Sequence, residues 1–236
     1  MLWYKNWLET RFRLVFMVLF AVFPIPLMTL TTRSMDSGHP PPFAAVKAAV
    51  GFFALYYSFV PLMLAGSGIK TQATFQARRG LHGSIYYTLS MPVSRLRIFA
   101  TRAGLGMLEA IGVLAIAPCA VWIIFPPLRM RVTASDLLAY WATFSVCVSA
   151  LYFLGVLAST FLDEIWQSWT SMFGVVVLRF LLDRLPVPAP VNIFKAMGED
   201  SSLFTHSFPW ARMAFSVGAA AILFLVGLRV AQTREY

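Results

Sequence analysis

Residues 75–102 read FQARRGLHGSIYYTLSMPVSRLRIFATR and form the longest polar interruption between two strongly apolar blocks of the chain. Within this stretch, Ile85, Tyr86 and Leu89 have the spacing of one face of a short helix, which Pro92 closes. Loops rich in Lys and Arg stay on the cytoplasmic side of a membrane. The stretch contains no Asp or Glu and five arginines, Arg78, Arg79, Arg95, Arg97 and Arg102. The sequence therefore predicts a cytoplasmic loop over residues 67–102 that carries a short partner-binding helix.

The composition on both sides of this loop indicates a membrane protein. The chain has 236 residues, of which 59% are hydrophobic and 12% are charged. Ordinary soluble domains are about 45–50% apolar and about 25% charged. The net charge of +9 is explained by the cytoplasmic bias of basic residues and by anionic lipid headgroups, so we expect no nucleic-acid partner.

The apolar blocks predict a single all-α transmembrane domain over residues 1–236, because each membrane span requires about 20 predominantly apolar residues. Pro24 and Pro26 should kink or fray the first span, and Pro126 and Pro127 should end the third. Six spans are expected, at about residues 14–32, 43–66, 103–125, 137–162, 165–182 and 210–231.

Residues 1–13 are predicted to form an amphipathic helix at the membrane surface. Trp3 and Trp7 share one side of this helix, which Phe12 extends, whereas basic residues lie on another face. The alternative is the basic start of a signal peptide, but no small-residue cleavage site follows.

The proline-rich segment 183–209 has two equally supported interpretations. It is too polar to span the membrane and too apolar for a simple solvated loop. Residues 191–197 could form a short helix that dips into the outer leaflet, or the segment could be a folded loop that rests on the membrane surface.

The distribution of basic residues places both termini in the cytoplasm. The predicted cytoplasmic side holds 11 of them: Lys5, Arg11, Arg13, Lys70, Arg78, Arg79, Arg95, Arg97, Arg102, Arg229 and Arg234. The outer side holds 7: Arg33, Lys47, Arg129, Arg131, Arg184, Lys195 and Arg212.

Glu109 and Arg179 are ionisable residues inside predicted spans, and each has a structural and a functional interpretation. Glu109 could pair with Arg102, seven residues earlier on the same helix face, or it could line a transport path. Arg179 precedes Asp183 by one helical turn, so a local ion pair accounts for it, and contact with a substrate is the alternative.

The sequence contains no catalytic or metal-binding pattern that we recognise. Cys119 and Cys147 fall inside apolar blocks, and the three histidines lie far apart. The run GSGIKT over residues 66–71 has Ile69 where a phosphate-binding loop requires glycine before the lysine. We therefore expect that any ATP used by this protein is hydrolysed by a partner chain.

The central loop resembles that of the type-2 permeases of ATP-binding-cassette (ABC) exporters. Those permeases commonly carry G-T-L-E-x-L-L-S-L-P-V-S-R between their second and third spans, and residues 83–95 read GSIYYTLSMPVSR. Two features depart from the family pattern: Tyr86 replaces the usual acidic residue, and Arg78 and Arg79 replace acidic residues upstream of the glycine. The matching positions are Gly83, Ser84, Ile85, Leu89, Ser90, Met91, Pro92, Val93, Ser94 and Arg95.

The resemblance implies a permease subunit in a bacterial plasma membrane, with a coupling helix formed around Gly83, Ser84, Ile85, Tyr86, Leu89, Pro92 and Arg95. It implies two ATPase subunits and a second permease copy or homologue as partners. ATP and Mg²⁺ would be bound by the ATPases, and export would be the direction of transport. The alternatives are a stand-alone membrane enzyme or channel, or a membrane scaffold that does not transport.

Overall fold

The computed structural model describes residues 2–34, 43–66, 93–125, 132–162 and 164–233. All regular structure in these residues is helical, which confirms the all-α prediction. The elements are α1 (Leu2–Val22), α2 (Pro24–Ser34), α3 (Phe43–Leu64), α6 (Arg95–Leu114), α7 (Ile116–Ile124), α9 (Ala134–Phe161), α10 (Glu164–Arg184), the 3₁₀ helix η1 (Ala189–Val191), α11 (Ile193–Met197), α12 (Ser202–Thr205) and α13 (Trp210–Thr233).

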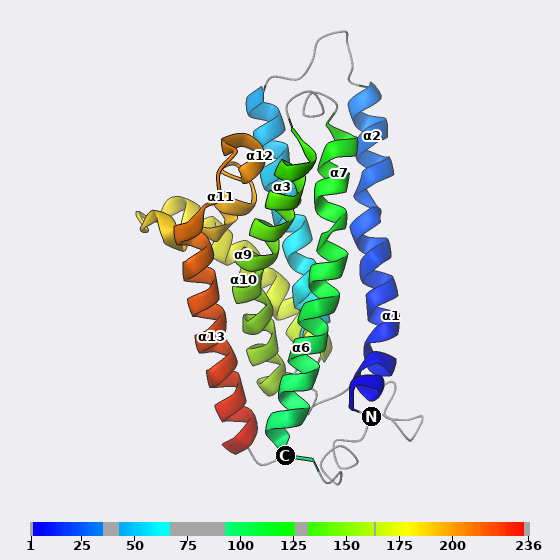
Figure 1. The fold of residues 1–236 in the computed structure, drawn as a ribbon, viewed down its shortest axis with the longest axis vertical. Coiled ribbons are helices and arrows are strands. Elements are labelled where there is room, and N and C mark those ends of the chain that lie inside the picture. Colours follow the sequence, from blue (N-terminus) through cyan, green and yellow to red (C-terminus); the bar gives the residue numbers. More distant parts are fainter. Residues whose placement is uncertain (1, 35–42, 67–92, 126–131, 163, 234–236) are drawn as a thin grey trace.

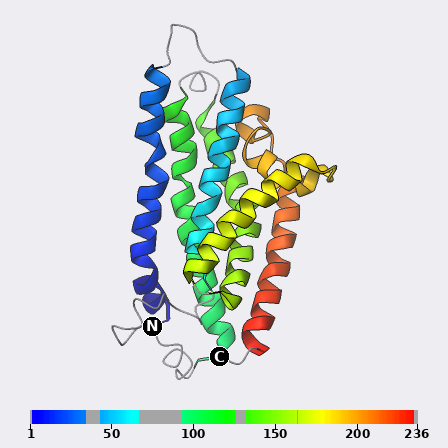
Figure 2. The same cartoon turned by 180° about the vertical axis from the view of Figure 1, so that it is seen from behind.

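The long helices form a bundle whose two chain ends lie at the same end (Figure 1). We call this the inner end. The pair α1–α2, α3, the pair α6–α7, α9 and α13 follow the long axis of the bundle, whereas α10 crosses it obliquely (Figure 2). The short elements η1, α11 and α12 connect α10 to α13 towards the other, outer end (Figure 1).

Five helical stretches in the described residues are long and apolar enough to cross a membrane, as expected for an integral membrane protein. They correspond to the predicted first, second, third, fourth and sixth spans. They are Thr10–Thr29, Val46–Leu64, Arg95–Ile124, Ala134–Phe161 and Trp210–Thr233. The predicted fifth span forms α10, which is not among these five.

The helix predicted over residues 1–13 is continuous with the first span in the described residues, because α1 runs without interruption from Leu2 to Val22. No glycine or proline lies within this range, and nothing else breaks the ladder of backbone hydrogen bonds.

The predicted loop 67–102 also ends too late. α6 begins at Arg95, and the side chain of Ser94 caps it by accepting a hydrogen bond from the Arg97 backbone N–H at 3.4 Å. Three of the five arginines that suggested a loop occupy the first two turns of this helix: Arg95, Arg97 and Arg102. Val93 and Ser94 are the only residues of the predicted coupling motif before α6 that the structure describes.

Pro24 interrupts the first span, as predicted. Proline has no N–H, so the Phe20 carbonyl lacks its helical donor, and the Tyr56 hydroxyl donates to it at 2.6 Å. The neighbouring Ala21 carbonyl accepts from the Tyr57 hydroxyl at 2.9 Å. Two tyrosines of α3 therefore cap the break between α1 and α2.

A second break, which the sequence analysis did not anticipate, divides the third span. Pro118 cannot donate to the Leu114 carbonyl, and the helix is interrupted at Ala115. The Trp141 indole N–H donates to the Ile111 carbonyl at 3.0 Å, one turn before the break. Here too an aromatic side chain from another helix satisfies backbone acceptors at a proline kink.

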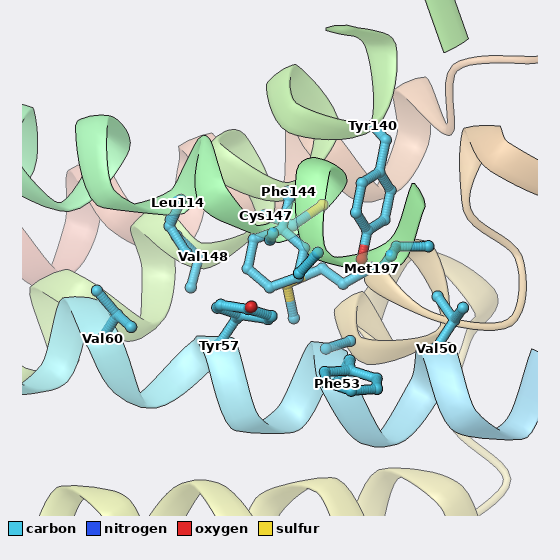
Figure 3. Packing of buried hydrophobic residues seen from close by; sticks show 14 of the residues in the cluster. Val50, Phe53, Tyr57, Val60, Leu114, Tyr140, Phe144, Cys147, Val148 and Met197 are labelled. Atoms are coloured by element: carbon cyan, nitrogen blue, oxygen red, sulfur yellow. The ribbon is translucent and has the colours of Figure 1, made fainter. Parts of the chain in front are cut away.

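The bundle core lies between α3 and α9 and also receives residues of the segment that follows α10. Phe53 and Tyr57 of α3 face Phe144 of α9, and Met197 of α11 packs beside them (Figure 3). A Cβ atom placed on Gly198 would lie 2.8 Å from the Gly51 Cα. Because Gly51 is about 12 Å along α3 from its first residue, this part of segment 183–209 packs inside the bundle.

Candidate functional site

The predicted coupling segment lies mostly outside the described residues. Gly83, Ser84, Ile85, Tyr86, Leu89 and Pro92 belong to this undescribed part. Arg95 is described, and its Nη1 donates to the Gln232 carbonyl at 3.3 Å. Arg95 therefore connects the start of α6 to the last turn of α13 at the inner end.

The helices on either side of the coupling segment are held together where it leaves and rejoins them. α3 ends at Leu64, just before the segment, and α6 begins just after it. The last residues of α3 are surrounded by side chains from α6, α9 and α10. We call this group the loop-base cluster: residues 62–66 with Arg102, Gly106, Tyr152, Gly155 and Gln167.

Two glycines allow the helices of the loop-base cluster to approach closely. A Cβ atom on Gly106 would lie 2.5 Å from the Tyr152 hydroxyl oxygen and 2.9 Å from the Leu64 carbonyl oxygen. A Cβ atom on Gly155 would lie 2.9 Å from the Ala65 Cβ. No larger residue fits at either position without displacing a neighbour.

Polar side chains complete the cluster. Gln167 of α10 is 1% exposed, and its Nε2 donates to the Leu62 carbonyl at 3.1 Å. Arg102 is 2% exposed, and its Nη2 would lie 3.2 Å from a Cβ atom on Gly66. A cation at this position is favoured by the partial negative charge at the C-terminal end of α3.

Glu109 lies on the side of α6 that faces α1. The residue is 8% exposed, and its Oε1 accepts a hydrogen bond of 2.6 Å from the Thr10 hydroxyl. The sequence analysis offered Arg102 as one possible partner, but the hydrogen bond that Glu109 accepts comes from α1. One turn away, Asn6 Nδ2 and Thr101 Oγ1 are 3.4 Å apart and link the same two helices.

Arg179 forms the local ion pair that its spacing predicts, since its Nε lies 3.7 Å from Asp183 Oδ2. It also donates through Nη1 to the Gly51 carbonyl of α3. The other carboxylate oxygen, Asp183 Oδ1, accepts from Asn192 Nδ2 at 3.1 Å. Arg179 and Asp183 border a hollow of about 230 Å³, which Gly51, Phe194, Lys195 and Glu199 also line.

The structure therefore separates the two ionisable residues. Glu109 lies between α6 and α1, whereas Arg179 lies between α10 and α3. The aromatic residues assigned to the membrane surface all lie on α1 with exposed side chains: Trp3, Trp7 and Phe12 are 52%, 42% and 67% exposed.

No cluster of three or more potential metal ligands occurs in the residues that the structure describes. His206, the only histidine among them, pairs with Asp136 at 3.2 Å from Nδ1 to Oδ1. This contact joins the end of α12 to the first turn of α9.

The sequence analysis missed Thr10 and Gln167. Thr10 is adjacent to the charged face of α1, and its partner is 99 residues away. An amide within a predicted span, as at Gln167, was the one available signal, because such groups form hydrogen bonds when buried. The sequence does not indicate which carbonyl it reaches, and that carbonyl lies 105 residues earlier.

No known protein family, curated protein or solved structure matches this chain.

Proposed function

We propose that this protein is the membrane-spanning permease subunit of an ABC transporter, driven by ATP that a separate ATPase subunit hydrolyses. The observation that carries the proposal is the pattern GSIYYTLSMPVSR over residues 83–95, placed between two membrane-spanning helices, α3 and α6. By its resemblance to type-2 exporters, the complex contains two ATPases and two permease copies and moves its substrate outward.

The loop-base cluster supports this proposal mechanically. A force applied to residues 83–95 would reach the described part of the bundle through the end of α3 and the start of α6, which flank this segment. At that level α3 is in close contact with α6 through Gly106 and with α9 through Gly155. Close-packed interiors transmit displacement instead of absorbing it. Movement of the coupling helix would therefore tilt these helices together and open a path on the outer side.

We assign α10 as the fifth of six spans in this proposal, with both termini in the cytoplasm of a bacterial cell. Its large aromatic residues point outward: Trp166, Trp169 and Phe173 are 67%, 67% and 71% exposed. Its polar residues Gln167 and Arg179 bind α3 carbonyls, so they are satisfied within the protein, as a bilayer requires.

The proposal is tested by co-purification. The chain is expressed with the product of a neighbouring gene that carries a phosphate-binding loop, and co-elution and ATPase activity are measured. We expect a stable complex, and replacing Tyr86 and Leu89 together by Asp should abolish it, because charged residues cannot enter an apolar groove.

The matched control replaces Tyr86 by Phe and Leu89 by Ile, which keeps the helix face apolar and should preserve the complex. Membrane insertion of each variant is checked by its resistance to alkaline extraction. The same yield of complex from the Asp variant would remove residues 83–95 from the interface. A wild-type chain that forms no complex would exclude the assignment.

A further inference from the structure

A hollow of about 270 Å³ lies between α1 and α6, and nothing in the transport proposal uses it. Its walls are aliphatic except at one residue. It is open on one side, since α1 is a peripheral helix with most of its apolar side chains exposed. The hollow is lined by Leu14, Val18, Glu109, Gly112, Val113 and Ile116.

The polar residue in this hollow, Glu109, has an unused acceptor. Its Oε1 accepts from Thr10, whereas its Oε2 is buried and has no hydrogen-bond partner. A buried carboxylate oxygen without a donor is unfavourable, because the oxygen has lost its water. The hollow beside it is the space from which a donor could reach it.

The walls of the hollow restrict the chemistry of that donor. Apart from Glu109, the side chains that line it are aliphatic: Leu14, Val18, Val113 and Ile116. A charged head group would lose its water here and meet few groups able to replace it. A neutral hydroxyl group supplies the missing hydrogen bond and adds no charge.

We propose that the hollow between α1 and α6 binds a single-chain amphiphile with a neutral hydroxyl head, which donates to Glu109 Oε2 while its alkyl chain lies along Val18, Val113 and Ile116. The volume suits one chain, since it exceeds the roughly 150 Å³ of a cavity that holds benzene and lies just below the usual range for drug-sized ligands, about 300–1,000 Å³. This site is independent of the ATPase assignment.

The test uses the full-length protein in liposomes and a long-chain alcohol that carries a photoreactive diazirine on its alkyl chain. After irradiation, labelled peptides are identified by mass spectrometry. We expect labelling within residues 14–18 and 113–116. Decan-1-ol should compete about tenfold better than decyl methyl ether, which has the same chain but no donor; tenfold is the size expected for one hydrogen bond to a charged group.

Two variants distinguish the contact with the hydroxyl head from the contacts with the alkyl chain. Glu109→Ala removes the acceptor, so the preference for the alcohol over the ether should fall to about onefold, while labelling persists. Gly112→Leu should fill the hollow, because Gly112 lines it and a Cβ atom there meets no heavy atom within 4 Å, and labelling should be lost. Gly104→Leu is the matched control on the same helix: it also points into open space but lies outside the hollow.

Equal competition by the alcohol and the ether in the wild-type protein would overturn the proposed head group. Labelling that survives Gly112→Leu, or that is lost equally in Gly104→Leu, would overturn the site. Because each measurement is made on the isolated chain, failure here leaves the co-purification test of the transport proposal unaffected.

Discussion

Helix α10 donates hydrogen bonds to α3 at two levels along the bundle. The two levels differ in whether water could replace a donor that is removed. At the inner level, Gln167 donates to the Leu62 carbonyl, and at the outer level Arg179 donates to the Gly51 carbonyl. The donors are about 18 Å apart along α10 and the acceptors about 16 Å apart along α3, so the two helices run in opposite directions and are joined at both levels.

The inner contact is enclosed and uncharged, since Gln167 is 1% exposed and lies against Gly155. The outer contact is charged and borders a hollow of about 230 Å³, and the Arg179 side chain is 22% exposed. A buried acceptor that loses its donor keeps its full desolvation cost, whereas one beside a hollow can be rehydrated. The two hydrogen bonds should therefore contribute unequally to stability, and the inner level should be the more rigid one.

The most severe test of the enclosed level is Gly106→Val. Its new side chain would collide with the Tyr152 hydroxyl and with the Leu64 backbone, which cannot rotate away. We expect the free energy of unfolding to fall by roughly 2–3 kcal/mol, measured by denaturant titration in mixed micelles with tryptophan fluorescence. Gly104→Val on the same helix is the control, because a Cβ atom there meets no heavy atom within 4 Å. It should change the free energy of unfolding by less than about 0.5 kcal/mol. Similar losses in the two variants would show that the close approach at Gly106 does not determine the stability.

Gln167→Met removes the inner hydrogen bond with little change in volume. The Leu62 carbonyl would remain buried without its donor, so we expect a loss of about 2 kcal/mol that does not depend on salt. The reference is Gln232→Met, because the Gln232 side chain is exposed on α13 and its replacement should be close to neutral. A loss for Gln167→Met no larger than that of the reference would mean that water reaches the inner level.

Arg179→Met should cost less, about 1 kcal/mol, although it removes an ion pair as well as a hydrogen bond. Water in the hollow can hydrate both the Gly51 carbonyl and Asp183, and Asn192 still donates to that carboxylate. The loss should shrink further in 1 M salt, which screens the ion pair in the wild-type protein. A cost above that of Gln167→Met in the same titration would reverse the proposed order of the two levels.

The sequence predicted the outer contact better than the inner one, and the reason is the distance between partners along the chain. Arg179 and Asp183 are one turn apart, so helical spacing alone predicts their pairing. The acceptors of Gln167 and Arg179 are carbonyls 105 and 128 residues earlier. Which carbonyl a buried donor reaches depends on how two helices cross, and one sequence does not contain that information.

The same distinction applies to the fold. The apolar blocks predicted most ends of the long helices to within a few residues, and Pro24 predicted the first kink. The start of α6 was predicted too late, because the positive charge of Arg95, Arg97 and Arg102 was assigned to a basic loop. Ser94 is the local signal of the true helix start, since its side chain caps α6. The Thr10–Glu109 bond could not be predicted, since nothing in the neighbouring sequence shows that Thr10 is buried or which residue it meets.

The smallest expected effect is that of Asp183→Asn, and it isolates the charge at the outer level. The amide oxygen can still accept from Asn192, and Arg179 keeps its bond to Gly51, so only the attraction across 3.7 Å is lost. Because the Asp183 side chain is 42% exposed, this attraction should contribute only about 0.2–0.5 kcal/mol. The measurement is a double-mutant cycle with Arg179→Met at low and high salt, in which the coupling energy should vanish at 1 M salt. A salt-independent coupling above about 1 kcal/mol would mean that the pair is desolvated and that the outer level is as enclosed as the inner one.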